Sequence, residues 1–290
     1  MARRHVDPPP EDRAELDFVY ADAMREVWKR FPDDPVVGVL FADALMIINL
    51  DWRAWGTDEE RGEYTTEIVA TIERVLEIAP DHAGAHHFYI HAVEGSDRPE
   101  RALPSAERLG SLMPAAGHMV HMPSHIYIRL GMYDAAVAAN ARAVAEDDRF
   151  FAEAPRSGIY HLYRAHNHHF LSWAAMFRGS RADAMETAQA MVAKLPESYE
   201  DYPGIDTYRF VPMHVMMRFG EWEAMLAEPA PAAEHVITTA LGHHARAVAF
   251  ANTDRFDEAR REAALFDEAA EQIEDDTKLR RSRSDTLLEA

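Results

Sequence analysis

The chain has 290 residues, 48% of them hydrophobic, with no cysteine and a formal net charge of −20 at pH 7. This length allows a substantial hydrophobic core, and no run of about 18 or more apolar residues predicts a transmembrane helix. The lack of cysteine excludes disulfides and thiolate ligands or nucleophiles. The acidic balance argues against nucleic acids and anionic membranes as partners. The N-terminal residues lack the pattern of a signal peptide, so we expect a cytoplasmic setting.

Apolar residues recur at helical spacing along most of the chain, and no segment alternates convincingly with the period of two that is typical of strands. We expect residues 1–10 to be disordered, residues 49–62 to form a loop, and residues 276–290 to be a frayed, charged tail. The predicted helices are 11–30, 36–48, 65–78, 83–94, 99–113, 117–130, 133–147, 159–177, 181–195, 205–219, 222–227, 234–251 and 256–273. The sequence therefore predicts one all-α domain over residues 11–275.

Helix pairs recur at a period of about 34 residues, the spacing between Pro80 and Pro114. The turns within the pairs carry glycine, and an aromatic residue and alanines follow, as in the segment from Gly131 to Ala136. Glycine permits a tight turn, and alanine lets two helices approach closely. This pattern resembles the tetratricopeptide repeat. The resemblance implies a right-handed superhelical array of helix pairs, in which the first helix of each pair lines a concave groove.

Histidines share one face of a predicted helix between Gly117 and Gly131. His118, His121 and His125 are three and four residues apart, so their imidazoles project together from a helix. Neutral imidazole is the commonest protein ligand for first-row transition metals. Several imidazoles on one face would repel when protonated and need partners when neutral, and a shared metal ion satisfies both conditions.

The register that the repeat resemblance implies places histidines of three helices in the groove. Seven of twelve groove positions are histidine, whereas 16 histidines in 290 residues predict about 0.7 by chance. The candidate metal ligands are His87, His91, Glu94, His118, His121, His125, His166 and His169. Glu94 and His169 are also candidate catalytic groups, Glu94 as a general base. The candidate substrate-binding residues are Arg129, which could hold an anionic group, Trp173 and His214.

Two phrases, from His86 to Glu94 and from His118 to Tyr127, also resemble a set of uncharacterised bacterial tetratricopeptide-repeat proteins. Those proteins carry a His-Met-Pro-Ser-His-Ile-Tyr signature, which runs here from His121 to Tyr127. This chain departs from the set by having His86 where asparagine is usual. The resemblance supports residues 83–170 as the shared site, and it implies no known reaction.

The histidine-rich face predicts a metal-dependent enzyme that acts on a small molecule in the groove. An imidazole-rich ligand set without thiolate suits Cu, Fe, Zn or Mn, with about one or two ions per chain. We favour oxidative chemistry with Cu or Fe, and metal-assisted hydrolysis is the first alternative. The second alternative is a non-catalytic scaffold that binds a peptide or protein partner, although peptide grooves usually carry Lys, Arg and Asn. A metal-free histidine cluster also remains open, and the sequence sets no oligomeric state.

Overall fold

The computed structural model describes residues 13–48, 64–155, 158–196, 205–229, 235–273, 278–279 and 282–283. The described chain is all-helical except for an antiparallel pair of two-residue strands, β1 (Lys278–Leu279) and β2 (Ser282–Arg283). The pair lies within the predicted charged tail, and the sequence does not predict it because two residues are too few to show alternation. The predicted disordered segment 1–10 and the loop 49–62 lie outside the described residues. None of the described helices is long and apolar enough to cross a membrane.

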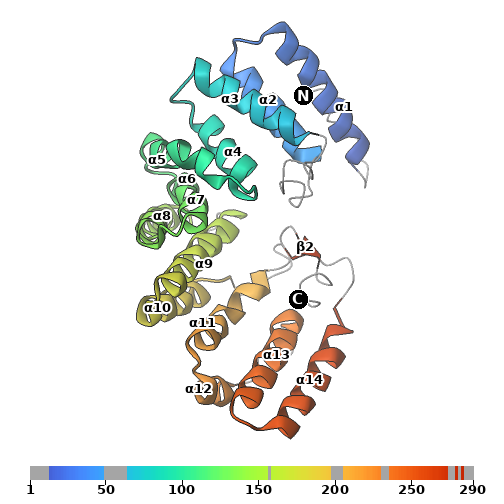
Figure 1. Ribbon diagram of the computed structural model, residues 1–290, viewed down its shortest axis with the longest axis vertical. Coiled ribbons are helices and arrows are strands. Elements are labelled where there is room, and N and C mark those ends of the chain that lie inside the picture. Colours follow the sequence, from blue (N-terminus) through green and yellow to red (C-terminus); the bar gives the residue numbers. More distant parts are fainter. Residues whose placement is uncertain are drawn as a thin grey trace. The chain divides into compact units, whose positions relative to one another are not determined.

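The chain forms two compact units, residues 1–143 and 144–290. In the first unit, each of the first four helices packs against the next (Figure 1). The elements are α1 (Ala14–Arg30), α2 (Pro35–Ile48), α3 (Thr65–Ile78), α4 (Ala83–Glu94), the 3-10 helix η2 (Pro99–Ala102), α5 (Leu103–Leu112), α6 (Gly117–His121) and α7 (Pro123–Arg129). Helix α8 (Tyr133–Glu153) begins in this unit and ends in the second. The predicted single domain with a right-handed superhelical arrangement stays a prediction.

The core of the first unit uses residues one helical turn apart. Phe41 and Leu45 of α2, and Ile68 and Ile72 of α3, are at most 1% exposed. Helix α4 adds Ile90, which is also fully buried. The helices that carry histidines therefore bury an apolar face, and this packing fixes the direction in which their other faces point.

The segment 117–130, predicted as one helix, forms two short helices, α6 and α7, that meet at Met122. The break has a local cause, because Pro123 has no N–H to donate to the preceding turn and its ring crowds that turn. Met122 nevertheless keeps helical backbone angles, φ −48° and ψ −39°. The three histidines of this segment therefore keep the spacing that places them on one side.

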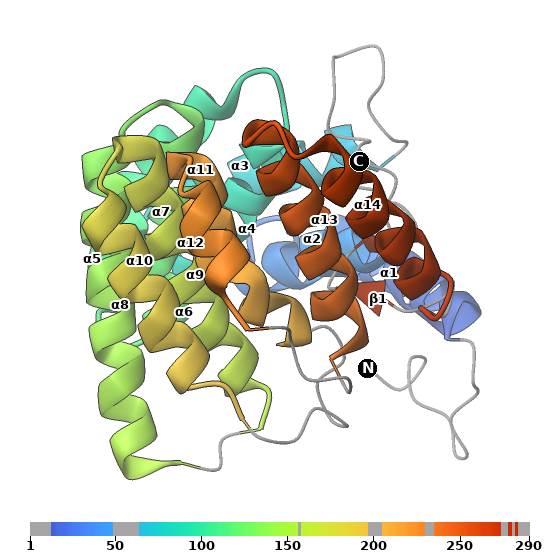
Figure 2. The same cartoon turned by 90° about the horizontal axis from the view of Figure 1, so that it is seen from below.

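The second unit continues with helices that pack mainly against their neighbours in sequence. Its elements are α9 (Tyr160–Arg178), α10 (Arg181–Ala193), the 3-10 helix η3 (Ile205–Phe210), α11 (Val211–Phe219), α12 (Trp222–Ala227), α13 (Val236–Asn252) and α14 (Phe256–Ala270). Helices α9 and α10 pack together, as do α13 and α14 (Figure 2). Gly179 and Gly220 end α9 and α11 in the left-handed conformation, with φ of 83° and 70°, which explains the glycines predicted at these turns.

Candidate metal centre

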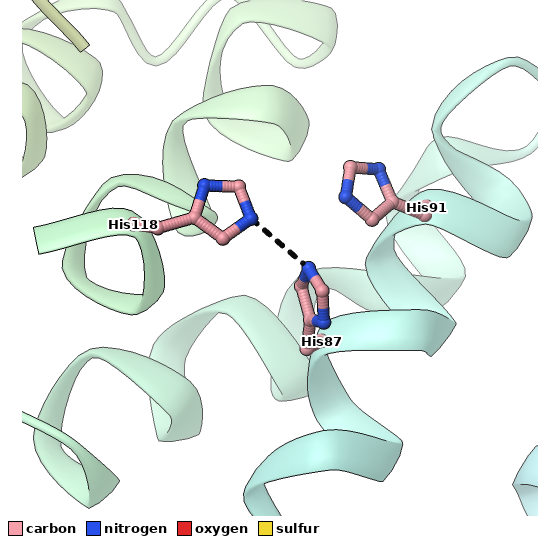
Figure 3. A group of neighbouring side chains, drawn as sticks. All are labelled: His87, His91 and His118. Carbon is pink, nitrogen blue, oxygen red and sulfur yellow. Dashed lines mark hydrogen bonds between the residues drawn. The ribbon is translucent and has the colours of Figure 1, made fainter. Parts of the chain in front are cut away.

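Three imidazoles of the first unit converge from two helices. His87 and His91 lie one turn apart on α4, and His118 lies on α6; one ring nitrogen of each is within 4.8 Å of those of the others (Figure 3). His87 Nε2 and His118 Nε2 are 3.2 Å apart. Two nitrogens bound to one tetrahedral ion at about 2.0–2.1 Å would be about 3.3 Å apart. These three side chains could therefore hold a metal ion with little movement.

Glu94 lies between two of the histidines and bonds to both. Its Oε1 accepts a hydrogen bond of 2.8 Å from His91 Nδ1, and its Oε2 accepts one from His125 Nδ1 on α7. Helix α4 packs against α7, which brings this carboxylate to His125. Because an ionised carboxylate only accepts, both histidines carry a proton on Nδ1. Glu94 was predicted as a ligand or general base, and the structure gives its oxygens these two imidazole partners.

His121 and His125 face each other through their Nε2 atoms at 2.9 Å. The side-chain oxygen of Asn140, on α8, accepts a 2.6 Å hydrogen bond from His121 Nδ1, while the Asn140 amide donates to Ala136 O. His121 therefore also carries its proton on Nδ1. Two neutral imidazoles in these tautomers would direct lone pairs at each other, so this contact requires either a proton on one Nε2 or a metal ion that both nitrogens bind.

The cluster favours neutral imidazoles, the form that binds metals. Burial, with the charges of neighbouring imidazoles second, lowers the pKa of His87 to about 2 and that of His118 to about 3. Burial, with the charge of His125 second, holds the pKa of His121 well below its usual value. Burial alone would raise the pKa of Glu94, but His125 and His91 outweigh it and hold this pKa well below its ordinary range. At neutral pH, the site therefore combines an ionised carboxylate with neutral imidazoles at His87, His118 and His121.

Two histidines next to the cluster have structural partners instead. His82 Nδ1 accepts a hydrogen bond from Ala85 N and caps α4. His86 is buried, and its ring nitrogens bond to Ser105 Oγ and Pro80 O at 2.9 and 2.8 Å. The position at which this chain departs from the bacterial signature thus links α4 to the preceding turn and to α5.

Among the candidate substrate residues of the first unit, Arg129 is exposed and donates a 2.9 Å hydrogen bond to the carbonyl of Ser96. This bond ties the end of α7 to the turn after α4. The predicted role in binding an anionic group stays a prediction.

The remaining candidates belong to the second unit, where aromatic rings surround them. His166 of α9 packs against Phe170 with ring centroids 4.8 Å apart. His169 stacks on Trp173 at 6.4 Å with an interplanar angle of 12°. His214 of α11 meets Phe210 edge to face at 4.5 Å. The predictions that His166 and His169 are metal ligands, and that His169 is catalytic, stay predictions.

Sequence reasoning missed Asn140, which orients the most buried histidine of the cluster. Both Asn140 and His121 are 0% exposed, and Ser124 Oγ lies 3.3 Å from His121 Nδ1. The available signal was an asparagine amid the alanines of a predicted helix, where a polar side chain needs a buried partner.

No protein-family model matches the chain, and no curated protein matches its sequence.

Proposed function

We propose that this protein is a metal-dependent enzyme that binds a transition-metal ion on the imidazoles of its first unit and performs oxidative chemistry on a small molecule. The observation that carries the proposal is the pair of Nε2 atoms of His121 and His125, 2.9 Å apart with both Nδ1 atoms committed to oxygen acceptors. Either a proton or a metal ion relieves the repulsion of such nitrogens, and a metal ion is the one that several imidazoles bind together.

His87, His91 and His118 are the first set of ligands in this proposal, because their nitrogens already lie within 4.8 Å of one another. His121 and His125 offer a second position, which corresponds to the expected one or two ions per chain. A tetratricopeptide-like array with these residues in its groove remains part of the proposal. The repeat would hold each helix pair by packing, so that the histidine faces stay available for ligands.

Glu94 supports oxidative chemistry over hydrolysis. In this proposal it positions His91 and His125 through their Nδ1 atoms, as carboxylates do behind many metal-bound histidines. Its strongly lowered pKa makes it a weak general base. Hydrolysis would need another base to activate water, whereas a Cu or Fe ion held by these imidazoles would supply electron transfer to O₂. Zn and Mn remain candidate ions for the hydrolytic alternative.

The proposal is tested by loading metal-free protein separately with Cu(II), Fe(II), Mn(II) and Zn(II) and following O₂ consumption with ascorbate as reductant. We expect consumption above that of the metal salts alone with Cu or Fe, none with Zn, and its loss in His118→Ala. The matched control is His82→Asn, which keeps a side chain able to cap α4. Ester hydrolysis only by the Zn or Mn form would replace the oxidative proposal with the hydrolytic one. Stable metal-free protein that takes up no ion would favour the peptide-binding scaffold.

A further inference from the structure

A cavity of about 510 Å³ lies between α9 and α11 of the second unit. Its volume falls within the range of small-molecule sites, about 300–1,000 Å³. Helix α9 contributes His169, Trp173, Met176 and Phe177, and α11 contributes His214, Met217 and Arg218. On each helix these residues are three or four positions apart, so one face of each helix lines the cavity.

Aromatic rings and thioethers form the walls. Trp173 and Phe177 meet edge to face at 5.4 Å and are 38% and 43% exposed. Met176 and Met217 line the cavity beside them. Flexible thioethers and ring faces pack well against a planar aromatic group, since sulfur–aromatic and ring–ring contacts are both favourable. The walls therefore suit an aromatic ligand better than a sugar or a polar chain.

Arg218 supplies the permanent charge of the lining. Among the described residues, its guanidinium makes a cation–π contact with Phe219, 5.8 Å from the ring centroid. Three other arginines of this unit, Arg178, Arg181 and Arg246, form ion pairs with carboxylates. In a chain with 50 acidic and 30 basic residues, a cavity arginine without a described carboxylate partner points to an anionic ligand.

The imidazole of His214 completes the wall as a neutral group. It is accessible to solvent within the cavity, but the surrounding protein, with the nearby His244 as the second cause, lowers its pKa to about 4. At neutral pH this side chain can therefore accept or donate a hydrogen bond without adding charge. A cationic ligand over Trp173 would gain a cation–π contact, but it would meet the guanidinium of Arg218.

We propose that the α9–α11 cavity is a binding site for a planar aromatic carboxylate, whose ring packs against Trp173 and Phe177 and whose carboxylate pairs with Arg218. This site is independent of the metal centre proposed above, because its lining contains only second-unit residues. A guanidinium forms paired hydrogen bonds with a carboxylate, which a neutral amide of the same shape cannot reproduce.

The test is calorimetric titration of the full metal-free chain with 2-naphthoate and with its neutral amide, 2-naphthamide. Metal-free protein is used so that coordination of the carboxylate by an ion cannot contribute. We expect one naphthoate per chain and at least about tenfold weaker binding of the amide, the size of one charge-assisted hydrogen bond. Arg218→Gln should remove this preference, whereas Arg260→Gln, at an exposed position of α14, should keep it.

A second pair of variants tests the ring contacts. Phe177→Ala should weaken naphthoate and naphthamide by a similar factor, about fivefold or more, because both ligands lose the same packing. Phe256→Ala, which removes a phenylalanine that is 53% exposed outside the cavity, should change neither. Circular dichroism checks the helical fold of each variant. No binding of naphthoate, equal affinity for acid and amide in the unmodified chain, or unchanged selectivity in folded Arg218→Gln would overturn the proposal.

Discussion

The histidines of the first unit's cluster and those of the α9–α11 cavity differ in what their rings face. In the first unit, imidazoles contact other imidazoles, with centroids 4.8 Å apart for His121 and His125 and 5.1 Å apart for His87 and His118. In the second unit, His169 and His214 contact aromatic rings. Facing imidazole nitrogens can bind one metal ion together, whereas an imidazole packed against an aromatic ring has no second imidazole there to share an ion. The neighbours of a histidine thus distinguish the proposed metal ligands from the histidines that line the cavity, although both occur at the same helical spacing.

We expect the largest loss of stability when His121, the most buried histidine of the cluster, is replaced. Replacing it with alanine leaves a buried cavity and removes the hydrogen-bond partner of Asn140, so metal-free His121→Ala should lose about 3 kcal/mol of unfolding free energy. His87→Ala, which removes a partly exposed ring, should lose less than about 1 kcal/mol. Urea denaturation of both variants measures the difference. Equal losses would mean that the two histidines occupy similar environments, against their burial in the structure.

The second prediction concerns Glu94, the carboxylate that bonds to two histidines of the first unit. Glu94→Gln replaces an acceptor of two Nδ1–H groups with an amide that can accept only through its oxygen, so one histidine loses its orientation. We expect metal affinity to fall about 10- to 100-fold, the range seen for groups behind metal-bound histidines. Competition with a chelator of known affinity measures this change. The control is Glu107→Gln, an exposed position on α5 of the same unit. If the two variants bind metal equally well, Glu94 does not position the ligands.

The pH dependence of the stability of the metal-free protein tests whether the buried imidazoles are neutral in the folded state. The folded-state pKa values of His87 and His118 are about 2 and 3, against 6.5 for an ordinary histidine. Above about pH 6.5 both folded and unfolded states are neutral, so these groups do not oppose folding. As pH falls below that value, these histidines become protonated in the unfolded state but not in the folded state. Stability therefore decreases until the pH reaches the folded-state pKa values.

From pH 7 to pH 5, the buried His121 alone should account for a loss of up to about 2 kcal/mol. His121→Ala, although less stable, should therefore show a shallower decrease over this interval than the unmodified chain. Urea titrations at several pH values give the two slopes, and His82→Asn serves as the control with an unchanged slope. Parallel slopes in His121→Ala and the unmodified chain would mean that His121 titrates normally in the folded state.

The sequence predicted the helices well because apolar spacing and turn residues act locally. Helices α4 and α12 begin and end at the predicted residues, and the turn glycines Gly179 and Gly220 occupy helix ends. The shared face of His118, His121 and His125 also followed from spacing. The break at Met122, the position of Glu94 between two imidazoles and the role of Asn140 did not. The break comes from Pro123, because the helical spacing of the segment continues across it. The other two features depend on how α4, α7 and α8 meet, which spacing within one helix cannot specify.

The metal content of untagged protein tests the central claim most directly. Protein purified without a histidine tag, reconstituted and desalted, should carry about one or two transition-metal ions per chain by mass spectrometry, as expected when several imidazoles share each ion. His87→Ala combined with His118→Ala should lose about one equivalent, while His82→Asn should retain the full amount. Less than roughly a tenth of an equivalent in the unmodified chain, or the same content in the double variant, would contradict a metal centre at these histidines.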